Sequence, residues 1–479
     1  MSVLVVDVGT SGVRATLVRP DASIGEVHHL PVPASRPAPG VVELDAGALA
    51  EAALAVASAA LAGEGGVRAV GIAAQRASAI VWERSTGRPV APGIGWQDLR
   101  TTGQCLLLRP QGLRLSPNQS ATKLAFLLDL HDPRRERDLC FGTVESWIAW
   151  TLSSGTVHVT DATNAGVTGL VLPDGSDWDE AVLEVLRIPA RVLPRIVDSS
   201  GVVGDAAALP GAPPIAGLVG DQQASLIGQG CLRPGDAKAT FGSGGMLDCC
   251  TEERPSFAVR GEAGTFPIIA WQAGGVRHWG LEAIMLSAGS CVEWLRDGLQ
   301  LLTSVAESDA LAASVPDAGG ALFVPALAGL GTPRWDFGAR GALVGLDGST
   351  TRAQVVRAVL EGVAQRGADL LEAAEADSGL RVDELRVDGG MSTNATFVRL
   401  LASAIGRPVE LAELVEATTL GAAFLAGAAV GTWAALDEAA THLKPRAVVE
   451  PSGRLDRERW LEARERALRT VPALSALEF

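Results

Sequence analysis

The chain begins with MSVLVVDVGTSGVRATLV, residues 1–18, and this segment gives the strongest indication of the fold. An apolar run over Val3–Val6 carries Asp7 into a turn of small and hydroxylated residues at 9–12, and a second apolar run follows Arg14. Two apolar runs around a Gly-rich turn are typical of a β-hairpin. Its tip would offer backbone N–H groups and hydroxyls to a polyanion, and Asp7 at the strand end could hold Mg²⁺. Taken alone, such a turn is more often an ordinary hairpin.

A similar tip recurs in the middle of the chain, where ATFGSGG at 239–245 lies between two further strand-like runs. Both halves of the chain therefore open with a strand, a Gly/Thr/Ser tip, another strand and later helices. We expect two similar α/β domains, over 1–229 and 230–479, that place the two tips on facing walls of one cleft. The alternative is a single large α/β domain.

Composition narrows the classes of function. The 479 residues suffice for two or three domains. A net charge of −15 argues against nucleic acid as the main partner. No apolar run is long enough to span a membrane, and no signal peptide is recognisable at the N-terminus. The six cysteines form no C-x-x-C pair, which predicts free thiols in a reducing cytoplasm.

The hydrophobic pattern predicts alternating strands and helices. Strands are expected over 67–74, 237–241, 245–250 and 266–270, and loops with short strands over 197–216. Helices are expected over 46–63, 119–131, 143–152, 284–303, 353–377, 393–405, 421–430 and 454–470.

Two polar groups follow strand-like runs in the first half. Asp221 ends the run GLVGD at 217–221, where a carboxylate could accept a proton from a substrate hydroxyl and the amides after it could hold further hydroxyls. The alternative for Asp221 is a helix N-cap. Arg76 ends another such run, where it could pair with a substrate oxygen or with a structural carboxylate.

Two small-residue segments lie in the second half. At 385–392, LRVDGGMS ends a strand in Asp-Gly-Gly and leads into a helix. A base or ribose could therefore approach the glycine backbone, and a phosphate could bind at the N-terminus of the helix. At 416–423, EATTLGAA opens a helix whose small side chains would leave room for an adenine ring. Tight packing of strand against helix is the alternative for both.

Together these segments resemble the FGGY family of carbohydrate kinases, which has the actin-like ATPase fold, and within it the glycerol kinases. The resemblance runs almost from end to end. The segments that carry it, besides residues 3–18 and 240–245, are 71–82 (GIAAQRASAIVW), 142–166, 219–229, 323–346 and 387–431. Residues 341–361 fit one signature pattern of the family, and 118–130 fit the other except for Phe126, where the pattern has Trp.

The resemblance implies an α/β protein of two actin-like (ribonuclease H-like) ATPase domains flanking a central cleft. It implies a kinase that uses ATP and Mg²⁺ to phosphorylate a primary hydroxyl of a small polyol or sugar, glycerol above all. Asp7 would hold the metal and Asp221 would be the general base. The acceptor would lie against Arg76, Ala77, Trp96, Asn118, Asp221, Gln222 and Met246. ATP would lie against Thr10, Ser11, Arg14, Thr240, Gly242, Gly329, Gly389, Gly390 and Asn394.

The chain departs from the glycerol kinase pattern in its acceptor pocket. Ala77 replaces a Glu that hydrogen-bonds the polyol, Asn118 replaces a Tyr, and Met246 replaces a Phe. A buried hydroxyl without an acceptor costs roughly 1–3 kcal/mol, or about 5- to 150-fold in affinity. The loop that binds a sugar bisphosphate inhibitor in bacterial glycerol kinases is also missing, and residues 206–212 take its place.

These departures leave other functions open. One alternative is a kinase for another polyol or ketose, such as a tetritol, a pentitol or xylulose. Another is a catalytically silent, ATP-binding regulator, although such a protein has no reason to keep Asp221 and two glutamines facing the cleft. The expected partner is a small molecule, with no nucleic acid and no membrane, and analogy suggests a homodimer or homotetramer.

Overall fold

A computed structural model describes residues 1–62, 66–412 and 416–477 of the chain. In chain order its strands are β1 (Val3–Val8), β2 (Gly12–Val18), β3 (His28–Pro31), β4 (Glu43–Leu44), β5 (Ala69–Ala74), β6 (Ile80–Glu83), β7 (Gly93–Ile94), β8 (Leu139–Gly142), β9 (Val159–Asp161), β10 (Arg195–Val197), β11 (Ser200–Asp205), β12 (Pro214–Gly220), β13 (Ala237–Phe241), β14 (Gly245–Thr251), β15 (Phe266–Ala273), β16 (Val276–Met285), β17 (Leu322–Val324), β18 (Ala342–Val344), β19 (Leu385–Asp388), β20 (Val409–Ala412) and β21 (Pro445–Val449).

The α-helices are α1 (Ala46–Leu61), α2 (Thr102–Leu108), α3 (Ser120–His131), α4 (Val144–Leu152), α5 (Ala162–Gly166), α6 (Glu180–Leu186), α7 (Asp221–Gly228), α8 (Gly289–Asp297), α9 (Glu307–Ala313), α10 (Arg352–Ser378), α11 (Ala395–Ile405), α12 (Ala417–Ala429), α13 (Leu436–Ala440), α14 (Arg457–Ala467) and α15 (Pro472–Ser475). Among the described residues, no helix combines the length and apolarity needed to cross a membrane.

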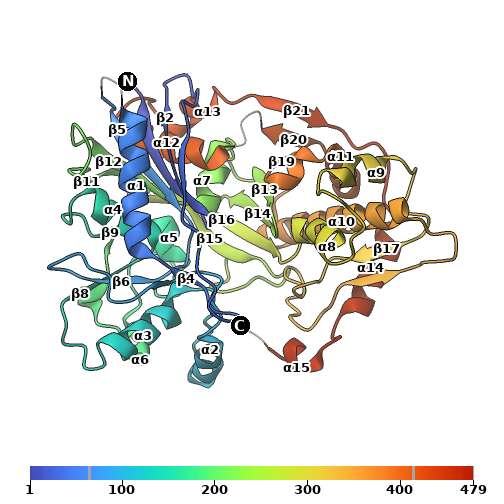
Figure 1. Ribbon diagram of the computed structural model, residues 1–479, viewed down its shortest axis with the longest axis horizontal. Helices are drawn as coiled ribbons and strands as arrows, with labels where there is room; N and C mark the ends of the chain where they lie inside the picture. The colour runs from blue at the N-terminus through green and yellow to red at the C-terminus, as the bar shows by residue number, and fades with distance from the viewer. Residues whose placement is uncertain (63–65, 413–415, 478–479) are drawn as a thin grey trace.

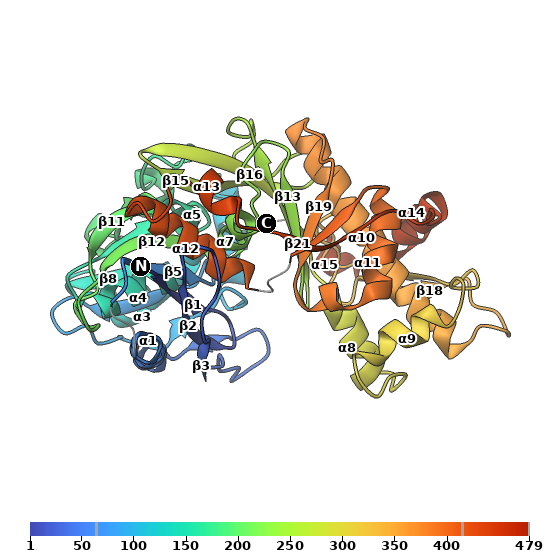
Figure 2. The same ribbon diagram turned by 90° about the horizontal axis from the view of Figure 1, so that it is seen from above.

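A mixed sheet of 13 strands, counted over the described ranges, crosses both halves of the chain in the order β21-β20-β19-β13-β14-β16-β15-β11-β12-β5-β1-β2-β3 (Figures 1 and 2). The predicted hairpin at residues 3–18 is confirmed as β1 and β2, antiparallel, with Asp7 opposite Arg14. The second predicted hairpin is confirmed as β13 and β14.

Helices cover both faces of the first-half sheet, so every residue of β1 is buried. Leu4 and Val6 point toward α1 and α4, whereas Val3 and Val5 point toward α12. The unbroken apolar run at the N-terminus is thus the signature of a strand enclosed on both sides. In the second half, α10 and α11 pack against the sheet around Phe241 and Phe397, which meet edge to face.

The carboxyl ends of three parallel strands are level with one another. β1 pairs with β5 in parallel, and β5 pairs with β12 in parallel, so that Val8, Ala74 and Gly220 lie side by side. The residues around or just after these ends include Asp7, Arg76 and Asp221. Such an edge is where open α/β sheets bind their ligands.

Most of the predicted elements are confirmed within a few residues, but the helix predicted over 284–303 is too long at both ends. β16 runs as far as Met285, and α8 covers only Gly289–Asp297. The apolar run LEAIML at 281–286 contains no Gly or Pro to mark the change from strand to helix. Residue 63, the last of the predicted first helix, lies outside the described residues.

A helix from late in the chain packs inside the first half. In Figure 1 the orange α12 lies among blue and green elements, and it contacts α7, β12, β5 and β1. A Cβ on Gly421 would lie 1.9 Å from the carbonyl oxygen of Ala224, and one on Gly228 would lie 1.8 Å from that of Ala417. The two helices therefore cross backbone to backbone. The division of the chain at residue 229 stays a prediction.

We predict that Gly421→Ala destabilises the protein by about 3 kcal/mol or more, because the added methyl group forces α7 and α12 apart. Urea unfolding followed by circular dichroism measures this loss. Gly103→Ala is the matched control, since Gly103 is also helical but has open space around its Cβ position. There the same substitution should stabilise by up to about 1 kcal/mol. Equal midpoints for the two variants would contradict the close crossing.

Candidate active site

Arg76 and Asp221 meet where β5 and β12 end. Arg76 Nε lies 3.7 Å from Asp221 Oδ1, and the Arg76 side chain is only 9% exposed. Its methylene groups pass directly over Gly220, where a Cβ would lie 2.6 Å from Arg76 Cδ. The glycine before Asp221 thus makes room for the arginine that the sequence predicts in the acceptor site.

Arg76 is held from a second side by the other half of the chain. Its Nη2 lies 2.5 Å from Glu282 Oε2 on β16, and 4.0 Å from the sulfur of Met246 on β14. Burial alone would lower the pKa of Arg76, but Glu282 and Asp221 outweigh it and the pKa is raised. Nη1 is buried and has no hydrogen-bond partner among the described residues. The two hydrogens of this nitrogen can be donated to oxygens of a bound substrate.

Asp221 begins α7, and its neighbours fix its direction. Its Oδ1 accepts a hydrogen bond from the backbone N–H of Gln222 at 2.8 Å. The preceding residue, Gly220, donates its N–H to Thr163 Oγ1 at 2.9 Å, and Thr163 in turn donates to the buried Asp161. Burial raises the pKa of Asp221, although Arg76 opposes the shift. A carboxylate whose pKa is raised toward neutrality is a stronger general base.

Asp7 stands at the end of β1 near the same edge. Burial raises its pKa to about 7; Arg14 opposes this shift, and Asp221 and Glu416 add to it. Among the described residues, none donates a hydrogen bond to the Asp7 carboxylate. Arg14 is 3.3 Å from Glu416 instead. A buried carboxylate without donors is suited to a cation.

Three predicted pocket residues form one wall around a buried lysine. Lys123 Nζ donates to the carbonyl oxygens of Ala77 and Asn118, each at 2.9 Å, and Asn118 Nδ2 donates to the carbonyl oxygen of Trp96 at 2.9 Å. Burial lowers the pKa of Lys123 to about 7. Ala77 has a φ of 57°, so Lys123 holds its carbonyl in a conformation that an alanine rarely adopts.

The predicted nucleotide residues of the second half lie around the second tip. Thr240 lies opposite Asp388 across β13 and β19, which brings Gly389 over Phe241. Gly389 has a φ of +85°, and a Cβ there would lie 2.5 Å from the Phe241 carbonyl oxygen, so only glycine fits. Gly242 follows β13 and Gly390 follows Gly389, which places both at the same two strand ends.

Two further predicted contacts lie near the second tip. Ala328, next to Gly329, donates its N–H to Ser287, whose neighbour Ala288 donates to Ser243 of the tip. Asn394 uses its Oδ1 to cap α11 by accepting from Phe397 N at 2.8 Å. Its Nδ2 donates to Ser308 Oγ at 3.0 Å, so both ends of the side chain have partners within the protein, and its contact with the nucleotide stays a prediction. Thr10 and Ser11 lie exposed at the first tip. Residues 413–415 of the predicted nucleotide segment lie outside the described residues.

Sequence reasoning missed three charged residues beneath the acceptor site. Lys238, Asp248 and Glu282 are almost fully buried on neighbouring strands. Each is the one charged residue in an apolar run: Lys238 in AKATF, Asp248 in MLDCC and Glu282 in GLEAI. This isolated charge is the sequence signal from which they could have been predicted. A charge at such a position needs a partner, and here the partners are residues of the site.

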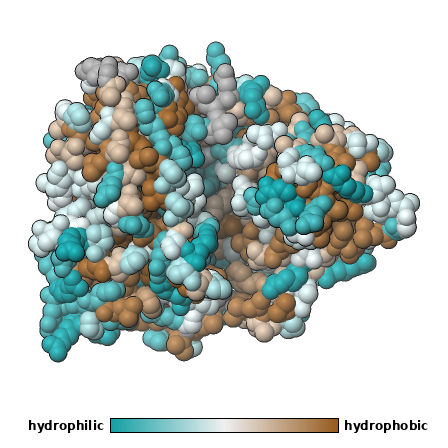
Figure 3. All heavy atoms as spheres, in the orientation of Figure 1, coloured by the Kyte–Doolittle hydropathy of each residue, from teal (hydrophilic) through white to brown (hydrophobic). Residues whose placement is uncertain are grey.

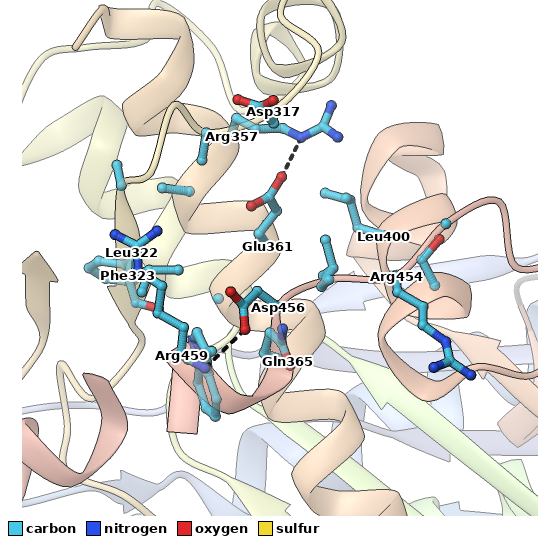
Figure 4. A pocket seen from close by; sticks show the side chains of 18 of the residues that line it. Asp317, Leu322, Phe323, Arg357, Glu361, Gln365, Leu400, Arg454, Asp456 and Arg459 are labelled. Carbon is cyan, nitrogen blue, oxygen red and sulfur yellow. Dashed lines mark hydrogen bonds and ion pairs between the residues drawn. The ribbon is translucent and has the colours of Figure 1, made fainter. Parts of the chain in front are cut away.

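The lobes of the molecule are separated by a groove, visible between the two halves in Figure 3. A separate pocket of about 400 Å³ opens in the second half between α10, α11, β17 and the start of α14. In Figure 4 Arg357 and Glu361, which are one turn apart on α10, form an ion pair along one wall, and Arg454 and Arg459 lie on different sides of the pocket. None of the predicted site residues lines that pocket, so the candidate chemistry belongs to the edge where Arg76 and Asp221 meet.

Comparison with known proteins identifies the fold and the family. Profiles of the N-terminal and C-terminal domains of the FGGY family of carbohydrate kinases match residues 2–228 and 237–430. The chain belongs to the FGGY family. It is 42% identical to a glycerol kinase of Aromatoleum aromaticum, over 98% of this chain and 99% of that protein.

Solved structures agree with this assignment. The crystal structure of Plasmodium falciparum glycerol kinase with ADP matches with a TM-score of 0.90 at 26% identity, over 98% of both chains. A ligand-bound xylulose kinase from Lactobacillus acidophilus matches in fold, with a TM-score of 0.87 at 20% identity over 99% of this chain and 98% of that one. The predicted two-domain actin-like fold is confirmed, and this FGGY protein is a phosphotransferase that acts on an alcohol group.

The raised pKa of Asp7 predicts a pH-dependent stability. An ordinary aspartate has a pKa of 3.8, whereas folded Asp7 has one of about 7. The folded state therefore binds this proton more tightly, and the stability that the proton contributes is lost as pH rises from 4 to 7. Relative to the unmodified protein, Asp7→Asn should gain up to about 4 kcal/mol over this range.

Urea unfolding at several pH values without divalent cations measures the difference. Thr10→Ala, which removes a neighbouring hydroxyl and no charge, is the control and should show a constant difference from the unmodified protein. Parallel stability curves for Asp7→Asn and the unmodified protein would show that Asp7 does not carry the raised pKa.

Proposed function

We propose that this FGGY kinase transfers the γ-phosphoryl group of ATP to a primary hydroxyl of glycerol. The observation that carries the proposal is the Arg76–Asp221 pair, a carboxylate with a raised pKa beside an arginine whose Nη1 has no hydrogen-bond partner among the described residues. The identity to glycerol kinases over nearly the full chain favours glycerol as the acceptor.

The proposed reaction needs a base and a donor at the acceptor. Asp221 takes the hydroxyl proton while the acceptor oxygen forms a bond to the γ-phosphorus, and the bond from that phosphorus to the bridging oxygen of ADP breaks. Arg76 Nη1 donates to another oxygen of the acceptor and thereby orients it. The two tips would enclose the phosphates, with Thr10 and Ser11 on one side and Thr240 on the other, and closure of the lobes would exclude water.

Mg²⁺ fits the residues at the first tip. Magnesium in kinases is held by one or two carboxylates together with substrate phosphates. Asp7 offers a buried carboxylate with no hydrogen-bond donor among the described residues, so a cation would relieve the cost of its charge. Bound there, the ion would neutralise negative charge on the phosphates. Asp7 would hold it, directly or through water.

The second candidate function is phosphorylation of another acceptor, and the residues of one pocket wall support it. Ala77 has no side-chain acceptor, and the side-chain amide of Asn118 is turned toward the Trp96 carbonyl. Compared with the glutamate of the family pattern, Ala77 leaves space and one unmet hydroxyl. That favours a tetritol, a pentitol or a ketose such as xylulose over glycerol if no water fills the gap. A silent ATP-binding regulator is disfavoured by the intact Arg76–Asp221 pair.

Location and assembly belong to the same proposal. All six cysteines are free and buried, which favours a reducing cytoplasm. The partner is proposed to be a small polyol or sugar rather than nucleic acid or a membrane, in keeping with the net charge of −15. A homodimer or homotetramer remains the expectation by analogy.

We predict that the protein releases ADP from Mg·ATP in the presence of glycerol, and that Asp221→Asn lowers kcat by at least about 100-fold. The amide keeps the shape of the side chain but takes no proton. A coupled assay against a panel of polyols and simple sugars measures both quantities, and ATP binding by the variant, which should change less than threefold, is the control. Full turnover by the variant would remove Asp221 as the base.

We also predict that Ala77→Glu raises kcat/KM for glycerol by roughly 5- to 100-fold, because it supplies the missing acceptor for a hydroxyl. The matched variant Ala77→Gln has the same length without the charge and should give a smaller gain. Activity on four- and five-carbon acceptors should fall in the same variants as the space is filled. An unchanged ratio of glycerol to pentitol activity would show that position 77 does not contact the acceptor.

A further inference from the structure

The chain has only three lysines, and two of them are completely buried. Lys123 supports the acceptor-pocket wall described above. Lys238 lies in the middle of β13, two residues before Thr240 of the second tip. The third, Lys444, is exposed. In a chain that otherwise uses arginine for positive charge, a buried lysine on a strand that leads into the site calls for a physical reason.

Lys238 Nζ touches three groups. It lies 2.7 Å from Gln222 Oε1, 3.0 Å from Thr240 Oγ1 and 2.8 Å from Asp248 Oδ2. Gln222 is the residue after the proposed base, and Thr240 is predicted to face the phosphates. The ammonium group therefore sits between the acceptor side and the phosphate side of the site, and the contact with Asp248 is an ion pair rather than a directed hydrogen bond.

An ammonium group donates hydrogen bonds and accepts none, so it dictates the orientation of both polar partners. Gln222 must turn its carbonyl oxygen to Lys238, which leaves its Nε2 hydrogens for another acceptor. Thr240 must accept at Oγ1, which leaves its own O–H free to donate. Among the described residues, no hydrogen-bond partner takes up either of these donors.

We propose that Lys238 is a positioning residue that orients two hydrogen-bond donors, one beside the acceptor and one beside the transferred phosphoryl group. Gln222 Nε2 then donates to an oxygen of the acceptor, and the Thr240 hydroxyl donates to an oxygen of the transferred phosphoryl group. This inference rests on the proposed kinase function and adds to it. It also defines the acceptor more closely: the hydroxyl that reacts gives its proton to Asp221, and a neighbouring oxygen accepts from Gln222 and Arg76.

Asp248 explains why the lysine can be buried. Its carboxylate is fully buried beside Lys238, and neither oxygen has a hydrogen-bond donor in the described ranges. It thus serves as the counter-charge of the ammonium group, which avoids an unpaired charge in the core. Its charge also contributes to raising the pKa of Arg76. Lys238 and Asp248 form a unit that is best removed together.

The test is the double variant Lys238→Met/Asp248→Leu, which replaces the buried pair with apolar side chains of similar size and leaves no lone charge. Freed from Lys238, the Gln222 amide and the Thr240 hydroxyl can turn either way. We expect KM for the acceptor to rise about tenfold and kcat to fall about tenfold, while KM for ATP changes less. Lys444→Met is the matched control and should change none of these constants.

A mutant cycle that combines Gln222→Met with the double variant distinguishes a positioning role of Lys238 from a general structural effect. Alone, Gln222→Met should raise KM for the acceptor about as much as the double variant does. If Lys238 acts through Gln222, adding Gln222→Met to the double variant should raise KM less than a further twofold. Multiplying effects would overturn the proposal, as would an unchanged KM in a folded double variant.

Gln222→Glu covers the case in which the double variant does not fold. The glutamate still accepts from Lys238 but has no N–H to give, so KM for the acceptor should rise as it does in Gln222→Met. An unchanged KM would overturn the proposal. If the unmodified protein phosphorylates no acceptor, the proposed function and this inference fall together, whereas activity with unchanged variants overturns the inference alone.

Discussion

The site depends on one constraint, namely that three parallel strands end at the same level. Hydrogen bonding between β1, β5 and β12 places Val8, Ala74 and Gly220 side by side, and the residues around those ends therefore share one edge. Asp7, Arg76 and Asp221 are far apart in sequence and meet for this reason. A slip of one residue in either pairing would turn their side chains to opposite faces of the sheet.

Charge balance is the second level of organisation. Two cations lie at the acceptor site, the nearly buried Arg76 and the fully buried Lys238 beneath it, and the carboxylates of Asp221, Asp248 and Glu282 surround them. Glu282 and Asp248 come from the second half, while Arg76 and Asp221 come from the first. The charged residues around Asp221 are therefore complete only when both halves are folded together. The close crossing of α7 and α12 serves the same end, because α7 carries Asp221 at its N-terminus.

Most strands and helices could be predicted from the sequence, because apolar runs and Gly-rich turns reflect the local conformational preferences of their residues. The family resemblance then supplied the list of site residues, from Asp7 to Asn394. What it could not supply was the role of residues outside the motifs. The helix predicted over 284–303 shows the limit, since the run that ends β16 has no local signal to separate it from α8.

Residue type and spacing alone were enough to predict the two tips, the enclosed strands, the family and the departures at Ala77, Asn118 and Met246. The packing of the folded chain was needed to show that Glu282 pairs with Arg76, that Lys123 holds the carbonyls of Ala77 and Asn118, and that Lys238 contacts Gln222 and Thr240. What a buried charged side chain does depends on the groups that it contacts. Those partners come from strands and helices that only the packing of the sheet and the two halves brings together.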